Sequence, residues 1–318
     1  MSVSALIFDT HRMVTDDGPG LRTTLFLKGC PLKCVWCHNP ESISPAPQVW
    51  WQKHRCIGCG ACVTACPEQA LRIDPEEGIQ IQRHRCTGCG TCARVCPSKA
   101  MELLGRPWTV EEATAFVLRD RAFYETGGGG VTLSGGEPTL QHRFVRDLFR
   151  NLRESGIHTA LDTCGLARWS VYEELLPLTD LFLWDIKVMD PNLHRKLTES
   201  PNKLILENLV RLAGALRAGA SSSLWIRTPL IPGMTDSPEN LRRIARFISE
   251  QLQGSVGRWE LCAFNGSCSP KYRRLGQNWP LADTEPLHRE QIETLRDALS
   301  ETAPHLLPII RFTGLIRK

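Results

Sequence analysis

Short apolar runs alternate with apolar helix faces along most of the chain. The run "TTLFLKG" (23–29) is apolar and rich in residues that favour extended structure, so we expect a buried strand there. Further along, "TLQHRFVRDLFRNLRESG" places Phe144, Leu148 and Leu152 four positions apart. Because a helix turns once in about 3.6 residues, these side chains share one face, and we expect an amphipathic helix.

The same two patterns predict seven strands and six helices. The strands are expected at 23–29, 131–134, 158–163, 181–187, 223–231, 258–264 and 306–312. The helices are expected from Thr109 onward and at 139–156, 170–178, 204–219, 238–253 and 285–302. This alternation predicts a parallel sheet with crossover helices. Six βα units are too few for an eight-unit barrel, so we expect an α/β fold built as a partial (β/α)6 TIM-like barrel.

Polar and reactive residues lie at the ends of six of these strands. In chain order they are Cys30, "SGGEP" (134–138), "DTCG" (162–165), "DIK" (185–187), Arg227 and Asn265. The carboxyl ends of parallel strands meet at one edge of a sheet, and binding sites form there. The sequence therefore predicts one site that collects all six groups.

Composition adds a second signal, because 14 of the 318 residues are cysteine. Eleven of the cysteines lie between Cys30 and Cys96. In a chain of this length with no export signal, such density favours metal ligation over disulfides. Cys164, Cys262 and Cys268 fall outside the dense region, and we expect them to be small buried residues.

The net charge and the hydropathy of the chain limit the partners and the cellular location that we expect. The net charge is +4 with no basic run, so we expect no nucleic-acid partner. The N-terminal "MSVSALIFDTHRM" has few consecutive apolar residues, and no stretch reaches about 18 of them. We therefore expect neither a signal peptide nor a membrane span, and a cytoplasmic protein without a membrane partner.

Residues 54–70 and 84–100 are a repeat. "HRCIGCGACVTACPEQA" and "HRCTGCGTCARVCPSKA" each contain the spacing C-x2-C-x2-C-x3-C-P of bacterial ferredoxins. In two-cluster ferredoxins the fourth cysteine of each run binds the other cluster. One 4Fe–4S cluster is thus assigned to Cys56, Cys59, Cys62 and Cys96, and a second to Cys66, Cys86, Cys89 and Cys92. A pair of zinc ribbons is the alternative, but zinc sites do not require this spacing twice.

The repeat divides the chain into two expected domains. A ferredoxin-like insert is expected at 49–104, bounded by proline-containing segments on both sides. The partial barrel would then comprise 1–48 and 105–318.

The stretch "KGCPLKCVWCHNPE" (28–41) has three cysteines, Cys30, Cys34 and Cys37. Three thiolates leave one metal position open, which is typical of a catalytic rather than a structural site. The loop "CPLKCVWC" resembles the cluster loop of radical S-adenosylmethionine enzymes. In that family a 4Fe–4S cluster is held by the three cysteines, and S-adenosylmethionine occupies its free iron.

Other segments narrow the resemblance to glycyl radical enzyme activating enzymes of the pyruvate formate-lyase activating enzyme type. They are "DGPGLRTTLFLKGCPLKCVWCHNPE" (17–41), "GGGGVTLSGGEPTLQ" (127–141), "LDTCG" (161–165), "DLFLWDIKVMD" (180–190) and "IRTPLIPGMTDSPENL" (226–241). The resemblance implies three 4Fe–4S clusters and reductive cleavage of S-adenosylmethionine to a 5′-deoxyadenosyl radical. That radical would abstract hydrogen from a backbone glycine of a partner glycyl radical enzyme. It also implies flavodoxin or ferredoxin as the electron donor, and a monomer.

The resemblance further implies residue roles. Catalytic roles are expected for Cys30, Cys34, Cys37, Lys187 and Asp17, with Asp17 facing the incoming peptide. Contacts to S-adenosylmethionine are expected from Trp36, Cys37, His38, Ser134, Gly135, Gly136, Glu137, Asp162, Asp185, Ile186, Lys187, Arg227 and Asn265. A monovalent cation is expected between Asp162, Thr163 and Asp185. Many relatives have histidine where this chain has Asn265, which can form hydrogen bonds but cannot titrate near neutral pH.

Two other functions fit part of this pattern. A radical S-adenosylmethionine enzyme acting on a small molecule or peptide would use the same three cysteines. It would not need the "DGPG" and "GGGGVTLSGGEP" segments. An electron-transfer ferredoxin fused to a structural barrel would leave Cys30, Cys34 and Cys37 without a role.

Overall fold

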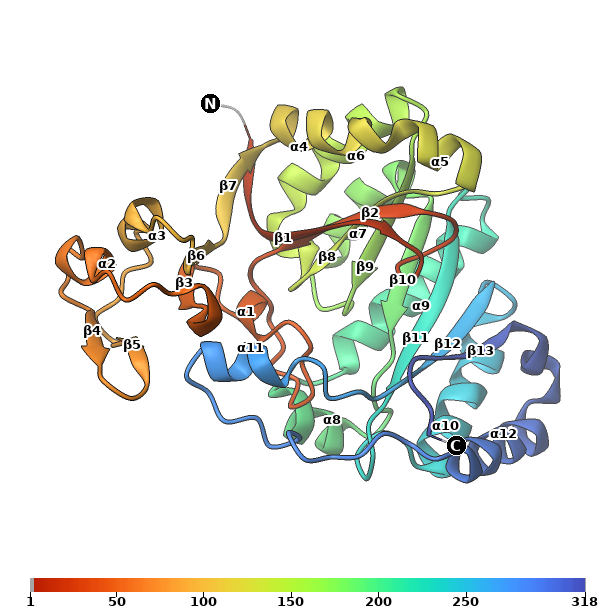
Figure 1. Ribbon diagram of the computed structural model, residues 1–318. Helices are drawn as coiled ribbons and strands as arrows, with labels where there is room; N and C mark the ends of the chain where they lie inside the picture. The colour runs from red at the N-terminus through yellow and green to blue at the C-terminus, as the bar shows by residue number, and fades with distance from the viewer. Residues whose placement is uncertain (1–2, 318) are drawn as a thin grey trace.

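A nine-stranded sheet forms the centre of the computed structural model, which describes residues 3–317 (Figure 1). Its strand order is β13-β12-β11-β10-β9-β8-β2-β1-β7. The strands are β1 (Ser4–Val14), β2 (Arg22–Leu27), β7 (Arg106–Thr109), β8 (Gly130–Gly135), β9 (His158–Thr163), β10 (Leu181–Asp185), β11 (Ser223–Leu230), β12 (Arg258–Ala263) and β13 (Ile310–Thr313). All neighbours from β2 to β13 pair in parallel. The seven strands of the sequence prediction are therefore confirmed, although β13 begins later than expected.

Two strands of this sheet, β1 and β7, were not predicted. β1 pairs antiparallel with β2 and β7 pairs antiparallel with β1, so together they extend the β2 edge. In β1 the side chains of Ala5 and Ile7 are buried, while most of the remainder is partly or fully exposed. So few buried positions give only a weak apolar pattern in the sequence. Residues 1, 2 and 318 of the expected barrel domain lie outside the described residues.

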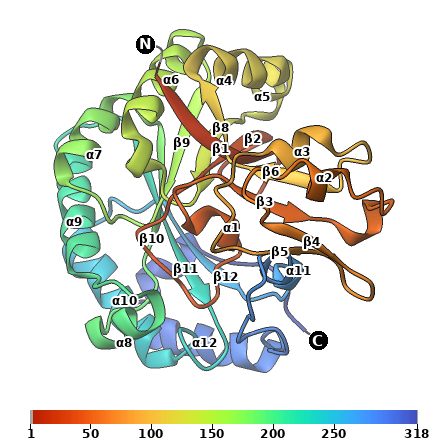
Figure 2. The same ribbon diagram turned by 90° about the vertical axis from the view of Figure 1, so that its left-hand side faces the viewer.

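Helices cover the sheet in the order that the alternation predicts. The larger ones are α4 (Val110–Val117), α5 (Arg121–Gly127), α6 (His142–Glu154), α7 (Trp169–Leu175), α8 (Pro191–Thr198), α9 (Lys203–Arg217), α10 (Pro238–Phe247) and α12 (Arg289–Thr302). Figure 2 shows α7, α9 and α10 following one another along one side of the sheet. Phe144, Leu148 and Leu152 of α6 are fully buried in the main core, which confirms the predicted apolar face.

The start of α4 also follows the prediction. Thr109 caps the helix: its Oγ1 accepts a hydrogen bond from the Glu112 backbone N–H at 3.2 Å, and Glu112 Oε2 accepts from the Thr109 N–H at 2.8 Å. This reciprocal pair satisfies two N–H groups that the helix itself cannot bond. Helices α5 and α8, and α11 (Ser269–Arg274), were not predicted, because each spans only six to eight residues, which is too short for a clear periodic pattern.

Residues 48–104 form a smaller unit beside the sheet, seen at the left of Figure 1. It contains two two-stranded sheets, β3 (Gln48–Trp51) with β6 (Met101–Leu104) and β4 (Leu71–Asp74) with β5 (Gly78–Ile81). The helices α2 (Ala61–Thr64) and α3 (Thr91–Val95) each follow a glycine in the left-handed conformation. The segment between the two halves of the repeat therefore forms an antiparallel hairpin of β4 and β5. Within residues 3–317, no helix is both long and apolar enough to cross a membrane.

Candidate functional site

A cavity of about 270 Å³ opens at the carboxyl ends of the parallel strands. Its walls come from the cysteine loop and from the ends of β8 to β12. The lining residues are Cys30, Leu32, Cys34, Trp36, Cys37, His38, Asn39, Ser42, Ser134, Gly135, Gly136, Asp162, Thr163, Cys164, Asp185, Lys187, Arg227, Pro229, Ile231, Cys262, Ala263 and Phe264. Five of the six predicted polar groups thus meet in one cavity, and Asn265 is the exception.

The cysteine loop is held from two sides by hydrogen bonds to its backbone. On one side the N–H groups of Lys33 and Val35 donate to carbonyls at the end of α8, at 2.9 and 3.0 Å. On the other side Tyr272 Oη donates to the Cys37 carbonyl and Trp279 Nε1 to the Val35 carbonyl, both at 2.9 Å. The Tyr272 and Trp279 rings stack with centroids 5.3 Å apart. Neither aromatic residue was predicted from the sequence, because no spacing links them to the distant cysteines.

The glycines of "SGGEP" pack against the backbone that leads into the cysteine loop. A Cβ on Gly136 would lie 2.1 Å from the Gly29 carbonyl oxygen, and one on Gly135 would lie 2.5 Å from the Leu27 nitrogen. Gly135 also has φ = +107°, which side chains disfavour. The Glu137 N–H then donates to the Gly29 carbonyl at 2.7 Å. Glycine is therefore required here by close packing of the backbone, in addition to any contact with a bound molecule.

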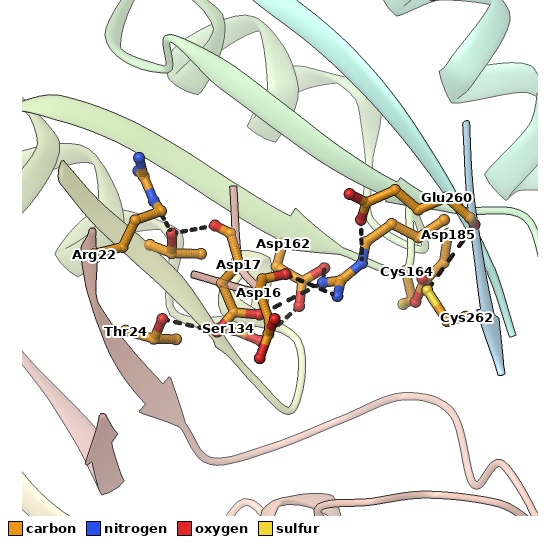
Figure 3. A network of polar contacts seen from close by, with 12 residues as sticks. Asp16, Asp17, Arg22, Thr24, Ser134, Asp162, Cys164, Asp185, Glu260 and Cys262 are labelled. Carbon is orange, nitrogen blue, oxygen red and sulfur yellow. Dashed lines mark hydrogen bonds and ion pairs between the residues drawn. The ribbon is translucent and has the colours of Figure 1, made fainter. Parts of the chain in front are cut away.

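Arg227 lies among three carboxylates at one wall of the cavity. Figure 3 shows the carboxylates of Asp17, Asp162 and Glu260, and each of them pairs with the Arg227 guanidinium group. The nitrogen–oxygen distances are 3.6 Å to Asp17, 3.5 Å to Asp162 and 3.5 Å to Glu260. Burial acts to lower the pKa of Arg227, but the surrounding carboxylates, Asp162 first, raise it well above its ordinary value. Arg227 therefore stays cationic and draws the Asp17 segment to the cavity wall.

Asp162 and Ser134 form a buried pair on adjacent strands. Ser134 Oγ donates to Asp162 Oδ2 at 2.6 Å. Burial raises the pKa of Asp162 to about 6, and the Arg227 cation offsets part of this effect. The carboxylate is therefore charged at neutral pH but close enough to titration to respond to acid.

Asp185 and Lys187 form an ion pair in the cavity wall. Lys187 Nζ donates to Asp185 Oδ2 at 2.5 Å, and the Lys187 side chain is only 10% exposed. Burial alone would lower the pKa of Lys187, but Asp185 and then Cys34 raise it above its ordinary value. The cavity thus offers both a fixed cation and fixed carboxylates, a pattern that complements a zwitterionic ligand with a further positive charge.

Four residues for which the resemblance implies a role in the site do not line the cavity. They are Asp17, Glu137, Ile186 and Asn265. Glu137 is fully buried, and its carboxylate accepts from Thr139, from Thr163 Oγ1 at 2.9 Å and from the Cys164 N–H at 2.7 Å. It therefore acts by holding the "DTCG" turn in place.

The other three have different surroundings. Ile186 is 1% exposed in the main core. Asn265 Oδ1 accepts from the Ser267 N–H at 3.1 Å and from its hydroxyl, so this oxygen is used within its own turn. Asp17 Oδ2 accepts from Thr24 Oγ1 at 2.8 Å, and its Oδ1 pairs with Arg227.

Cys164 and Cys268 are buried as expected and Cys262 is partly buried, but two of these three cysteines also line the cavity. Cys164 and Cys262 both line the wall, whereas Cys268 is 2% exposed in the cluster behind the cysteine loop. A hydrogen bond from Cys164 lowers the pKa of Cys30. By contrast, burial raises the pKa of Cys34 to about 12. The sequence could not reveal that Cys164 and Cys262 line the cavity, because they match no ligand spacing.

His38 lines the cavity beside Trp36. Burial, followed by the nearby Lys271 cation, lowers the pKa of His38, so the ring is neutral near pH 7. Trp36 is 6% exposed and packs in the same apolar cluster as Phe264. This wall is therefore flat, aromatic and uncharged, which suits stacking against a planar ring.

In the smaller unit the eight cysteines of the repeat line two cavities. One is lined by Cys56, Cys59, Cys62 and Cys96, and the other by Cys66, Cys86, Cys89 and Cys92. The fourth cysteine of each run thus lies with the first three of the other run, as the ferredoxin spacing predicts.

The spacing of the thiols bears on what each cavity can hold. Among residues 3–317, no three His, Cys, Asp or Glu side chains are close enough to ligate a single metal ion. A 4Fe–4S cluster makes a different demand, because each thiolate binds a separate iron of a larger group. The donor sets of all three cysteine sites consist of thiols, which are the ligands that such clusters use.

Three family models match the chain. They are the Radical SAM superfamily over residues 83–248, a 4Fe-4S dicluster domain over residues 55–100 and a 4Fe-4S single cluster domain over residues 16–54.

Similar proteins cover nearly the whole chain. The (2S)-3-sulfopropanediol dehydratase activating enzyme of Klebsiella oxytoca is 39% identical over 96% of both chains. The trans-4-hydroxy-L-proline dehydratase activating enzyme of Clostridioides difficile is 38% identical over 92% of this chain and 95% of its own. A radical SAM methyltransferase from Sphaerobacter thermophilus has a similar fold, with a TM-score of 0.52 at 16% identity over 97% of this chain and 78% of its own.

Proposed function

The chain belongs to the glycyl radical enzyme activating enzymes of the radical S-adenosylmethionine superfamily, and we propose that its 270 Å³ cavity is where it binds and cleaves S-adenosylmethionine. It is thus an oxidoreductase that acts on another enzyme. Cys30, Cys34 and Cys37 would hold one 4Fe–4S cluster and leave one iron free for S-adenosylmethionine. A reduced 4Fe–4S cluster held there would supply the electron that splits the sulfonium of S-adenosylmethionine and yields a 5′-deoxyadenosyl radical.

The observation that carries this proposal is the convergence of the three thiols with fixed charges of both signs. Lys187 and Arg227 present cations, and Asp162 and Asp185 present carboxylates, around the same cavity. S-Adenosylmethionine carries an ammonium, a carboxylate and a sulfonium, so it can pair with both signs. The neutral wall of Trp36 and His38 would stack against adenine. Asp162 and Asp185 would also flank a monovalent cation, while the Thr163 hydroxyl is already engaged by Glu137.

The remaining residues would act by positioning other segments of the chain or the incoming peptide. Glu137 keeps the "DTCG" turn against the cysteine loop, and Asp17 would present its segment to the incoming glycine peptide. We propose the partial (β/α)6 barrel at 1–48 and 105–318 and the insert with two further 4Fe–4S clusters at 49–104. The family models for a dicluster domain and the two four-thiol cavities support this division.

The protein substrate would be a glycyl radical enzyme, and its electron donor a flavodoxin or ferredoxin. Relatives named for several different partner enzymes match the chain at 34% to 39% identity. We therefore expect the partner to be selected by residues that differ among these relatives. Activation of a panel of glycyl radical enzymes would identify it.

The experiment that tests the function compares the wild type with a variant in which Cys30, Cys34 and Cys37 are all alanine. After anaerobic cluster reconstitution and reduction with dithionite, the wild type should convert S-adenosylmethionine to 5′-deoxyadenosine, and the variant should not. Cleavage that persists in the variant would refute the assignment. A glycyl radical doublet in electron paramagnetic resonance of a partner enzyme would complete the test.

A further inference from the structure

The short helix α1 (Pro40–Ile43) begins at the cavity wall, directly after the cysteine loop. Its N-cap residue, Asn39, lines the cavity together with Cys37 and His38. An asparagine at this position usually accepts a hydrogen bond from the first turn of its own helix. The Asn39 side chain forms no such bond, and the Ser42 N–H donates to the Asn39 backbone carbonyl at 2.8 Å instead. The amide group of Asn39 is therefore available for another contact.

Lys271 of α11 binds this amide group. Helices α1 and α11 lie side by side (Figure 1). Lys271 Nζ donates to Asn39 Oδ1 at 2.8 Å and lies 2.7 Å from Glu41 Oε1. The Glu41 side chain is 1% exposed, and its other carboxylate oxygen has no partner among residues 3–317. Because loss of the pair would leave a buried charge uncompensated, Lys271 is held firmly, and with it the oxygen of Asn39.

Helix α11 is itself held from two sides. From the smaller unit, Arg83 donates from Nη2 to the Arg274 carbonyl at 2.7 Å and from Nη1 to the Val49 carbonyl. On the other side, the Tyr272 hydroxyl bonds the cysteine loop. Lys271 therefore lies on an element whose position is fixed relative to the cavity.

The chemistry of lysine determines how the Asn39 amide is oriented. A lysine ammonium group only donates hydrogen bonds, so the amide oxygen of Asn39 must face Lys271 and the amide nitrogen must face away from it. Within residues 3–317, no protein group accepts a hydrogen bond from Asn39 Nδ2. Oδ1 also has a second lone pair that Lys271 does not use. Asn39 therefore brings an unpaired donor, next to an acceptor, to the cavity wall.

We propose that Asn39 binds the adenine ring of S-adenosylmethionine and that Lys271 is the positioning residue that orients its amide. The inference rests on the proposed function, in which adenine stacks on the neutral wall of Trp36 and His38. Adenine presents a ring-nitrogen acceptor beside the N–H donor of its amino group, and an asparagine amide can match that pair with two hydrogen bonds. Asn39 directly follows His38 and lines the same cavity. Stacking alone tolerates any base, whereas the amide adds a requirement for the hydrogen-bond pattern of the ring.

The variant Asn39→Asp tests the contact with adenine. It keeps the oxygen that Lys271 uses and a residue type that suits an N-cap, but a carboxylate cannot donate as the amide nitrogen does. The first probe is 5′-deoxyadenosine, which is neutral and therefore little affected by the added charge. The second probe is methionine, which has no base.

Both probes are measured on the wild type and the variant after anaerobic cluster reconstitution. Calorimetric titration should show about tenfold weaker binding of 5′-deoxyadenosine to Asn39→Asp. Methionine binding, followed by the electron paramagnetic resonance signal of the reduced protein, should be unchanged. Unchanged affinity for 5′-deoxyadenosine would overturn the proposal. Equal weakening of both probes would also overturn it, because a general disturbance of the cavity affects both halves of the ligand.

Replacement of the Lys271–Glu41 pair tests the positioning role. Lys271→Met combined with Glu41→Leu leaves no uncompensated buried charge, which limits the cost to folding. This double variant should bind 5′-deoxyadenosine severalfold more weakly than the wild type. The same two changes should cause no further loss in an Asn39→Ala background, because the amide that Lys271 orients is then absent.

Arg273→Met is the matched control, because Arg273 is an exposed cation on the same helix. It should bind 5′-deoxyadenosine as the wild type does. If the losses caused by Asn39→Ala and by the replaced pair simply add, Lys271 does not act through Asn39, and the positioning role is refuted.

Cleavage of S-adenosylmethionine by the wild type separates this proposal from the proposed function. If the dithionite-reduced wild type forms no 5′-deoxyadenosine, the proposed function is refuted. If the wild type forms it, and Asn39→Asp binds 5′-deoxyadenosine as tightly as the wild type, only the role of Asn39 is refuted.

Discussion

Asp162 is subject to two opposing effects of pH. Burial raises the pKa of its carboxyl to about 6 from an ordinary value of 3.8. Between these values the folded state binds a proton that the unfolded state releases, so this group's contribution to stability falls as pH rises toward 6. The affinity for a cationic ligand changes in the opposite direction and increases as pH rises, because only the ionised carboxylate attracts the ligand.

We expect the affinity for S-adenosylmethionine to weaken as pH falls through about 6, where Asp162 becomes neutral. Asp162→Asn should bind weakly at neutral pH and lose most of this pH dependence. Anaerobic calorimetric titration across the pH range would measure both effects. Asp9→Asn, at an exposed carboxylate, is the control and should behave as the wild type. A pH profile unchanged in Asp162→Asn would assign the titration to another group.

Tyr272 allows a second test, because Tyr124 provides a matched control. Each hydroxyl donates to one backbone carbonyl at 2.9 Å, Tyr272 to Cys37 and Tyr124 to Val117. Replacement by phenylalanine should cost about 1 kcal/mol of stability in either case. Only Tyr272→Phe should also reduce iron retention at the cysteine loop, as measured by iron content after mild chelation. Equal iron loss in both variants would contradict a positioning role for Tyr272.

At the scale of elements, the "GGGG" run is explained by the crossing of two chain segments. A Cβ on Gly129 would lie 1.7 Å from the Leu21 carbonyl oxygen, just before β2, and one on Gly130 would lie 2.1 Å from the His158 carbonyl oxygen, at the start of β9. These contacts allow β8 to lie between β2 and β9 in parallel register. The run therefore serves the assembly of the sheet, and the cavity residues Ser134, Gly135 and Gly136 follow only at the other end of β8.

We expect Gly129→Ala to lower the free energy of unfolding by about 3 kcal/mol or more, because the obstructing atoms belong to backbone. Gly214→Ala is the control: Gly214 lies in α9, and a Cβ there meets nothing within 4 Å. That change should stabilise the protein by up to about 1 kcal/mol, since alanine favours helix. Urea unfolding of the two variants measures the difference, and a fully stable Gly129→Ala would show that the two segments can separate.

For the whole molecule, the question is how firmly the smaller unit of residues 48–104 is held to the sheet. Buried polar groups lie at the junction: Lys28 is 1% exposed, and its Nζ donates to the Glu41 carbonyl at 2.6 Å and to Gln48 Oε1 at 3.0 Å. Burial lowers the pKa of Lys28 to about 8. Arg83 adds its two carbonyl contacts, so the attachment depends on a few directed hydrogen bonds.

Arg83→Ala should loosen this attachment without unfolding the main sheet. Hydrogen exchange should rise in β3 and α11, which Arg83 joins, while α6 and α9 keep wild-type protection. Arg85→Ala is the matched control, because Arg85 is exposed and its side chain reaches only Gln82 at 3.5 Å. Uniform deprotection across the chain in Arg83→Ala would indicate global destabilisation instead.

The sequence alone determined the parallel strands β2 and β8 to β13, the six helices α4, α6, α7, α9, α10 and α12, and the three thiol sets, because each depends on local spacing. Periodicity identifies a buried strand such as β10 or a helix face such as that of α6 wherever it occurs in the chain. Ligand spacing does the same for Cys30, Cys34 and Cys37, since a loop must bring all its thiols to one cluster. The polar residues at strand ends could also be placed together, because parallel strands end at one edge.

Only the tertiary structure decided which residues support those sites, because their contacts join positions far apart in the chain. Tyr272 and Trp279 bond the cysteine loop from more than two hundred residues away. Glu137 turned out to be a buried support, and Cys164 a cavity residue, for reasons that no local pattern encodes. The two halves of the repeat make the same point: they share one cysteine spacing, yet a Cβ on Gly88 would meet the Pro47 carbonyl oxygen, whereas one on Gly58 would meet nothing within 4 Å.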